Sequence, residues 1–157
     1  AAPPRRLTPA GWNVNTPAFS PDGRTVYFLS AKGGSQQLHA IDAKGGTPRA
    51  VTALPVDVTG FSLSPDGKRV VLGVETDVVG DIPSRPFGDF SDGAWAPDGK
   101  SLVVAARMAG REEPWSTNFD LYRVSADGTG TATNLTAANK AWDAGPVFSA
   151  DGNTLYY

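Results

Sequence analysis

Few side chains of this sequence could take part in breaking a covalent bond. His39 is the only histidine and cysteine is absent, so neither a nucleophile–base pair nor a histidine- or thiolate-based metal site can be assembled. A serine hydrolase of the α/β type places its nucleophile in a G-x-S-x-G turn, and no such run occurs. His39 alternates with Leu38 and Ala40, which predicts a side chain on the face of a strand. We therefore expect no catalysis, metal or cofactor in this chain by itself.

The carboxylates fall into two groups with different predicted roles. Four aspartates each stand directly before a glycine, where Asp hydrogen-bonds to its own backbone and Gly supplies a positive φ. We interpret them as structural turn residues: Asp22, Asp66, Asp98 and Asp151. Glu112 and Glu113 instead form an acidic pair in the run Arg111-Glu-Glu-Pro-Trp-Ser-Thr-Asn118. From residue type alone this pair is a solvated acidic loop, and Trp115 either forms an apolar wall beside it or anchors the loop.

The turn aspartates belong to a phrase that occurs four times. Each copy is followed by a short apolar run, and Pro, Asp and Gly at these spacings predict the tight turn of a β-hairpin. Third strands are predicted at 36–42 and 119–124, and fourth strands at 47–52 and 131–136. The four copies are Pro17-Ala-Phe-Ser-Pro-Asp-Gly23, Phe61-Ser-Leu-Ser-Pro-Asp-Gly67, Gly93-Ala-Trp-Ala-Pro-Asp-Gly99 and Pro146-Val-Phe-Ser-Ala-Asp-Gly152.

Repeats of four antiparallel strands with a period of about 40–45 residues are typical of β-propeller blades. We predict an all-β fold: a partial propeller of about three four-stranded blades in an incomplete ring. The single domain 1–157 would contain blades at roughly 11–54, 55–90 and 91–137, with a further blade starting at 144–157. Residues 5–10 would be the outer strand of a preceding blade.

The spacing of the turn aspartates singles out one interval. Asp22 and Asp66 lie 44 residues apart and Asp98 and Asp151 lie 53 apart, but Asp66 and Asp98 are separated by only 32. The blade at 55–90 is therefore incomplete. Either it has lost its outer strands or a segment around 75–90 is missing. We favour the second explanation, because a two-stranded blade would bury little of its neighbours' faces.

Four stretches carry a more specific resemblance, in addition to the repeated Asp-Gly phrase. They are Trp12-Asn-Val-Asn-Thr-Pro-Ala-Phe-Ser-Pro-Asp-Gly23, Pro83-Ser-Arg-Pro-Phe-Gly88, Glu113-Pro-Trp-Ser-Thr-Asn-Phe-Asp-Leu-Tyr122 and Asn139-Lys-Ala-Trp-Asp-Ala-Gly-Pro146. The repeats resemble those of TolB. The whole chain resembles the N-terminal propeller of bacterial prolyl oligopeptidase-family serine peptidases, of the dipeptidyl- or acylaminoacyl-peptidase type.

The resemblance implies a non-catalytic propeller that gates and orients peptide substrates for a C-terminal α/β-hydrolase domain absent from this chain. Some dipeptidyl peptidases of that family hold the substrate's α-ammonium group with an acidic pair. The resemblance therefore makes Glu112 and Glu113, with Trp115 as an apolar wall beside them, substrate-binding candidates. The chain itself would then be part of a hydrolase, most naturally periplasmic or secreted, with a cytoplasmic location still open.

Two other hypotheses remain open. One is a TolB-like module for protein–protein contact, and the other is a fragment that self-associates through open blade edges. The formal net charge of −2 and scattered Lys and Arg side chains predict no nucleic-acid partner. No apolar run approaches the roughly 20 residues of a membrane span, so no membrane partner is expected.

Overall fold

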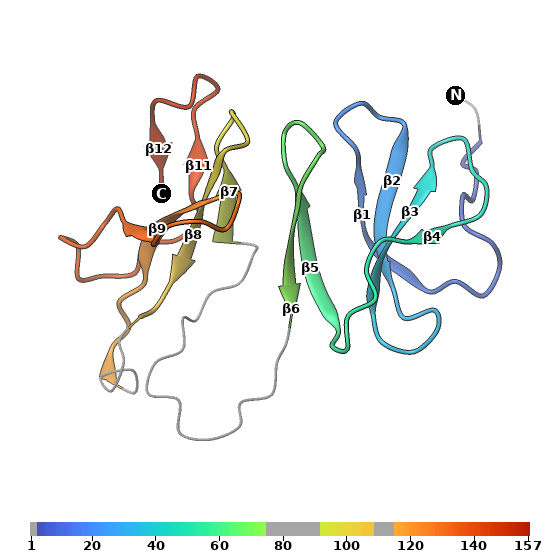
Figure 1. The fold of residues 1–157 in the computed structure, drawn as a ribbon, viewed down its shortest axis with the longest axis horizontal. Helices are drawn as coiled ribbons and strands as arrows, with labels where there is room; N and C mark the ends of the chain where they lie inside the picture. Colours follow the sequence, from blue (N-terminus) through green and yellow to red (C-terminus); the bar gives the residue numbers. More distant parts are fainter. Residues whose placement is uncertain (1–2, 75–91, 109–114) are drawn as a thin grey trace. The chain divides into compact units, whose positions relative to one another are not determined.

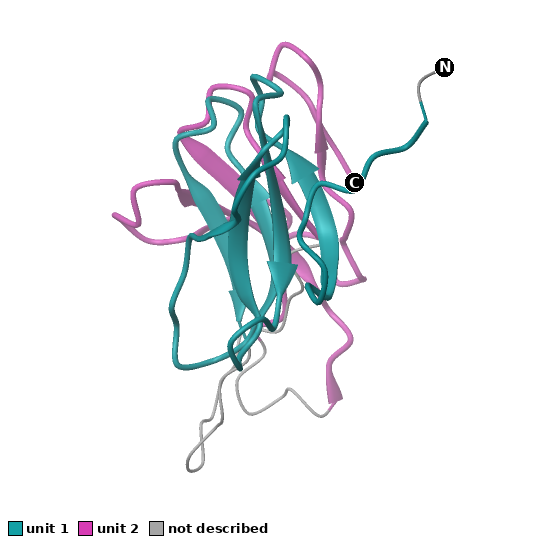
Figure 2. Ribbon diagram, turned by 90° about the vertical axis from the view of Figure 1, so that its right-hand side faces the viewer, with its two compact units in different colours: residues 1–76 teal, residues 77–157 magenta. Residues whose placement is uncertain are grey.

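A computed structural model describes residues 3–74, 92–108 and 115–157. Its named strands all pair with antiparallel neighbours, as Figure 1 shows. The chain divides into two compact units, residues 1–76 and 77–157, which Figure 2 colours separately. No helix among the described residues is long and apolar enough to cross a membrane.

The first unit contains a four-stranded sheet followed by a hairpin. The sheet has the order β1–β2–β3–β4 and the hairpin pairs β5 with β6. The strands are β1 (Val14–Phe19), β2 (Thr25–Ser30), β3 (Gln37–Asp42), β4 (Arg49–Ala50), β5 (Val58–Leu63) and β6 (Val70–Val74). Each strand is thus the sequence neighbour of the next in space, the arrangement that short tight turns favour.

Both faces of this sheet are covered. On one face Leu29, Leu38 and Val58 are fully buried, and side chains of the β5–β6 hairpin pack against them. On the other face Val26, Phe28 and Ile41 form a cluster that the N-terminal residues Leu7 and Trp12 cover. Because side chains alternate along a strand, β2 and β3 supply both clusters and read as nearly continuous apolar runs.

The N-terminal segment differs in form from the outer strand predicted at residues 5–10. These residues form no strand, and Leu7 instead packs on the cluster around Phe28. The Arg5 guanidinium donates to the carbonyl of Ala43 at 3.5 Å. Strand conformation requires a neighbour with free backbone groups, and no described strand pairs with this segment. Its assignment to a preceding blade stays a prediction.

The second unit repeats the arrangement of the first. Its four-stranded sheet has the order β7–β8–β9–β10, and a second hairpin pairs β11 with β12. The strands are β7 (Gly93–Trp95), β8 (Ser101–Ala106), β9 (Asp120–Ser125), β10 (Thr133–Asn134), β11 (Val147–Phe148) and β12 (Leu155–Tyr156). Val103, Ala105 and Leu121 form the core, and Phe148 and Leu155 from the hairpin pack against it.

The Asp-Gly turns also contact one another within each unit. Gly67 has a φ of +67°, and a Cβ placed on it would lie 3.1 Å from Cδ of Pro21 in the preceding turn. Gly152 has a φ of +72°, and its Cβ would lie 3.4 Å from Cδ of Pro97. Glycine at these positions therefore permits both the turn and the approach of a neighbouring proline.

Strand β1 contains a strained residue at a bulge. Its register with β2 shifts between Asn15 and Ala18, and Thr16 has a φ of +48°. A positive φ is unfavourable for a β-branched residue. Gly145 holds the corresponding place before Pro146 in the last repeat, with a φ of +63°. The positive φ therefore recurs in both repeats, and glycine adopts it without the strain that threonine has.

The predicted all-β class with four-stranded antiparallel blades is confirmed. The third strands fall within one residue of the predicted limits, at Gln37–Asp42 and Asp120–Ser125. The fourth strands are shorter than predicted, at Arg49–Ala50 and Thr133–Asn134. The short blade contributes the described hairpin β5–β6, whereas all of residues 75–90 lie outside the described residues. The domain limits of the blades stay predictions.

Candidate functional site

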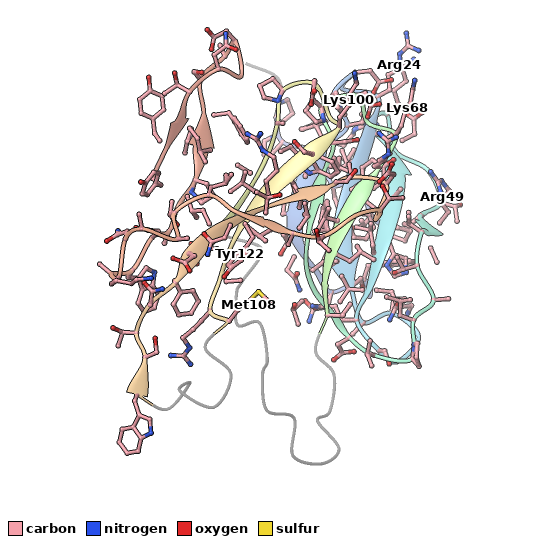
Figure 3. All side chains as sticks on the ribbon, turned by 60° about the vertical axis from the view of Figure 1, so that its left-hand side comes forward. Arg24, Arg49, Lys68, Lys100, Met108 and Tyr122 are labelled. Carbon is pink, nitrogen blue, oxygen red and sulfur yellow. The ribbon has the colours of Figure 1, made fainter. Side chains whose placement is uncertain are left out.

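The acidic pair predicted to bind substrate lies outside the described residues, and its neighbour Trp115 lies within them. Trp115 is 88% exposed, so its ring does not anchor the loop in an apolar core. The loop is closed at its base by Arg107, whose Nη1 donates to the carbonyl of Ser116 at 2.9 Å. Figure 3 shows Met108, which is 56% exposed, just beyond the end of β8. The assignment of Glu112, Glu113 and Trp115 to substrate binding stays a prediction.

His39 is enclosed by aromatic rings. It is 5% exposed, its ring stacks on Phe28 at 5.8 Å between centroids, and Trp12 approaches it edge-on at 5.1 Å. Nδ1 lies 3.0 Å from the carbonyl oxygen of Gln37. A histidine in these surroundings is a packing residue. Its described contacts are with Gln37, Phe28 and Trp12, and none of these is a nucleophile that it could activate.

The turn aspartates bind their own turns, as at Asp22. Its Oδ1 accepts the Ser20 hydroxyl at 2.6 Å and the backbone amide of Arg24 at 3.1 Å. The Ser20 hydroxyl, followed by the Arg24 amide, holds the pKa of Asp22 below its usual value. The same serine–aspartate contact lowers the pKa of Asp66 and of Asp151. These carboxylates accept hydrogen bonds inside exposed turns, the geometry of structural residues.

One of the four predicted turns lacks the serine, and a fifth turn has it. In the third phrase Ala96 replaces the serine, and Asp98 Oδ1 accepts the amide of Lys100 at 2.9 Å. A turn outside the four predicted copies, Ser125-Ala-Asp-Gly128, has the serine. There Thr129, followed by Ser125, lowers the pKa of Asp127 to about 2. Asp127 was not among the four predicted turn aspartates, although its Ser-x-Asp-Gly spacing matches that of Asp22.

An aromatic stack lies at the start of β9. Phe119 and Trp142 are 4.4 Å apart between centroids with an interplanar angle of 16°, and Cζ of Arg107 lies 5.5 Å from the Phe119 centroid. Trp142 is nevertheless 60% exposed. Stacking of this kind, with an arginine over the ring, holds flat groups in fixed positions and places Arg107, Phe119 and Trp142 on one face.

A polar network that sequence analysis missed begins at Asp120, which is 9% exposed. Its Oδ2 accepts Nδ2 of Asn134 at 2.8 Å and its Oδ1 accepts Nδ2 of Asn118 at 3.3 Å. Nδ2 of Asn134 also donates to the Tyr122 hydroxyl at 3.2 Å. Burial, followed by the charge of Asp120, raises the pKa of Tyr122, which Figure 3 labels. The signal in the sequence was an aspartate inside the apolar run from Phe119 to Val124.

Similar solved structures establish the class of fold. The chain aligns with TolB from Acinetobacter baumannii at a TM-score of 0.52 and 20% identity, over 94% of this chain and 37% of that one. A TolB-type protein of Agrobacterium tumefaciens aligns with a TM-score of 0.52 and 23% identity, covering 90% and 53% of the two chains. An oligogalacturonate lyase in complex with manganese aligns with a TM-score of 0.55 and 19% identity, over 74% and 38%. The chain has the fold of a TolB-like β-propeller, as predicted.

Comparison of sequences relates the chain to peptidases. The chain is 28% identical to dipeptidyl-peptidase 5 of Porphyromonas endodontalis, over 96% of its own length and 30% of the relative. It is 29% identical to the uncharacterized peptidase YuxL of Bacillus subtilis, over 90% and 21%. It is 30% identical to tricorn protease homolog 2 of Streptomyces coelicolor, over 89% and 12%. No family model matches the chain. The predicted resemblance to the propeller of bacterial peptidases is confirmed.

The lengths of these matches matter for function. The chain spans less than a third of each of the three peptidases, so its similarity is to a portion of each of them. The match to dipeptidyl-peptidase 5 extends over 209 residues, more than the 157 residues of this chain. That relative therefore carries residues that this chain lacks.

Proposed function

We propose that this chain gates and orients peptide substrates for a C-terminal α/β-hydrolase domain that the chain does not contain, in a serine exopeptidase. The observation that carries the proposal is the similarity of about nine-tenths or more of the chain to less than a third of three peptidases. The remainder of such a protein must supply the nucleophile, because this sequence has one histidine, no cysteine and no G-x-S-x-G run. We further propose a periplasmic or secreted location.

The chemistry of the proposed orientation is recognition of a free amino terminus. Two adjacent carboxylates, Glu112 and Glu113, would accept charge-assisted hydrogen bonds from the substrate's α-ammonium group and so fix the register of the peptide. Trp115, whose ring is 88% exposed, would offer apolar area next to them. The proposal for the two glutamates rests on the sequence and the resemblance alone.

The test uses the full-length protein that contains this chain. Glu112→Gln and Glu113→Gln should each lower kcat/KM for dipeptidyl p-nitroanilides by about tenfold or more, which corresponds to about 1.4 kcal/mol. Substrates with an acylated amino terminus carry no α-ammonium group, so the same variants should hydrolyse them at the unchanged rate. Equal losses on both substrates would contradict the proposed contact. The isolated chain should hydrolyse neither substrate. Serine-type turnover by it would contradict the assignment of catalysis to a separate hydrolase domain.

A TolB-like module for protein–protein contact is the second candidate, and the fold similarity to TolB favours it. The two candidates differ in what the full-length protein contains. A G-x-S-x-G run followed by Asp and His beyond this chain supports the peptidase, and a sequence without these residues supports the interaction module.

A further inference from the structure

Two segments of the second unit meet beside β9, and they come from stretches that the proposed function leaves unexplained. Phe119 forms an isolated parallel bridge with Trp142, and the amide of Asp143 donates to the Phe119 carbonyl at 2.9 Å. The stacked rings of Phe119 and Trp142 show that these two side chains point to the same side. The bridge therefore aligns residues 118–120 with residues 141–143.

Strand alternation then places three oxygen-bearing side chains together. Neighbours of a bridged pair point to the opposite side from it, so Asn118, Asp120 and Asp143 share the face away from the Phe119 and Trp142 rings. Bridged strands lie about 5 Å apart, which brings the backbones of Asp120 and Asp143 to about that separation. Arg107 is on the other face, because its guanidinium lies over the Phe119 ring.

The oxygens of this group are buried and only partly bonded. Asp143 is 3% exposed, and Asp120 is 9% exposed. Oδ1 of Asp143 accepts Nδ2 of Asn139, but Oδ2 of Asp143 and Oδ1 of Asn118 are buried with no hydrogen-bond partner among the described residues. Buried polar atoms are nearly always paired with protein, water or an ion, so these two oxygens require an occupant.

The charge of the group has no compensating Lys or Arg among the described residues. The groups that contact the two carboxylates are neutral: the amides of Asn118, Asn134 and Asn139 and the Tyr122 hydroxyl. Neither aspartate forms an ion pair with a Lys or Arg of the described residues. The ion pair found in that part of the chain joins Arg24 to Asp22 in the first unit. A buried carboxylate ordinarily has a cation beside it or coordinates a metal.

We propose that Asp120, Asp143 and Asn118 bind a hard divalent metal ion, with Ca²⁺ as the best fit. Ca²⁺ takes carboxylate, amide and hydroxyl or water oxygens in flexible geometry at about 2.3–2.6 Å. Asp143 and Asn118 would contribute their unpaired oxygens, Asp120 one or both of its own, and the Tyr122 hydroxyl lies in the same network. No group of three or more His, Cys, Asp or Glu side chains suited to a metal occurs in the described parts of the chain. The proposed site instead completes two carboxylates with neutral oxygens.

The ion would fasten the segment 139–143 to β9, which otherwise meet through the single bridge and the ring stack. This role is independent of peptide recognition at Glu112 and Glu113, so either proposal can fail while the other holds. It differs from the expectation of no metal site, which rested on the absence of cysteine and of a second histidine.

The test is thermal unfolding of the 157-residue chain after removal of metal with EDTA. Ca²⁺ at about 100 times its Kd should raise Tm by about 5–10 °C, with Kd at or below about 1 mM. Asp143→Asn and Asp120→Asn should each abolish this rise. Asp57→Asn is the matched control, since Asp57 is an exposed aspartate that accepts the Gln36 amide at 2.7 Å in the first unit, and it should keep the full rise.

A second measurement does not depend on how well a variant folds. Tb³⁺ bound to the wild-type chain should emit when Tyr122 is excited, because the phenol lies within the network of Asp120, and Ca²⁺ should quench the emission by competition. Absence of any Ca²⁺-dependent rise in Tm together with absence of Tb³⁺ emission from the wild-type chain would overturn the proposal. A rise that Asp143→Asn and Asp120→Asn both retain would overturn it equally.

Discussion

The two four-stranded sheets share one backbone arrangement and differ in the polar groups built on it. In the first sheet the Leu38 amide donates to Oγ1 of Thr52 at 2.9 Å, and in the second the Leu121 amide donates to Oγ1 of Thr136 at 3.0 Å. Each threonine follows the short outer strand and ties it to the third strand. The repeat therefore preserves a threonine clamp that secures the outer edge of the sheet.

The residue before each of these leucines shows the difference. Gln37 uses its neutral amide: Oε1 accepts the Thr52 hydroxyl at 2.8 Å and the Leu54 amide at 2.9 Å, and Nε2 donates to the Val56 carbonyl at 3.0 Å. Asp120 stands at the same register position of the second sheet and brings a buried charge, which the neutral side chains of Asn118, Asn134 and Tyr122 contact. The two sheets thus repeat the same clamps and turns and differ at this position, where the second sheet carries an aspartate of the proposed metal site.

The largest expected effect comes from the buried leucines that the clamps hold. Leu38 and Leu121 are both 0% exposed, so Leu38→Ala and Leu121→Ala should each lower the free energy of unfolding by about 2–5 kcal/mol. Urea denaturation followed by tryptophan fluorescence measures the loss. A cost below about 1 kcal/mol for either variant would show that the two sheets do not share the same packing.

The threonine clamp itself should rank next. Thr52→Val and Thr136→Val keep the shape of the side chain but leave the Leu38 or Leu121 amide without its acceptor, at a cost of about 1–3 kcal/mol. Thr136 is 7% exposed, whereas Thr52 is half-buried, so water can replace the lost bond more easily in the first sheet. Chemical denaturation should therefore show the greater loss for Thr136→Val, and the reverse order would refute the comparison.

The Asp-Gly turns offer a matched pair with a smaller effect. Gly23→Ala and Gly67→Ala both impose a positive φ on alanine, which costs about 1–2 kcal/mol. A Cβ at Gly23 meets nothing within 4 Å, but one at Gly67 would lie 3.1 Å from Cδ of Pro21. Gly67→Ala should thus lower Tm further than Gly23→Ala. Equal shifts in differential scanning calorimetry would mean that the contact between successive turns has no energetic consequence.

The smallest effect concerns pH and the β9–β10 turn. Thr129, then Ser125, depresses the pKa of Asp127 to about 2, so the stabilisation from this carboxylate is complete above its unfolded pKa of about 3.9 and lost as pH falls through about 2. Thr129→Ala should raise the pKa of Asp127 toward its usual value, and more than Ser125→Ala does. Carboxyl ¹³C chemical shifts followed across this range give the pKa directly. An unchanged titration in both variants would contradict the assigned cause.

Prediction from the sequence succeeded where structure depends on neighbours along the chain. The hairpins around Asp22, Asp66, Asp98 and Asp151 were located because Pro, Asp and Gly act on the backbone within a few residues. Prediction was less accurate at the outer strands: Arg49–Ala50 and Thr133–Asn134 are two residues each, since their length depends on where the neighbouring strand continues. The proposed metal site was not predicted from the sequence, because only His and Cys were considered as ligands and Asn118 was not.

By itself, the sequence determined the class of fold, the repeat of four-stranded blades, the absence of a complete catalytic set and the resemblance to peptidases. Only the tertiary structure brings the segments of Asp120 and Asp143 together. They are 23 residues apart in the chain, and no local rule requires the bridge between Phe119 and Trp142 that makes them neighbours. Turn chemistry acts over a few bonds, whereas burial and charge pairing depend on contacts that exist once the segments have packed.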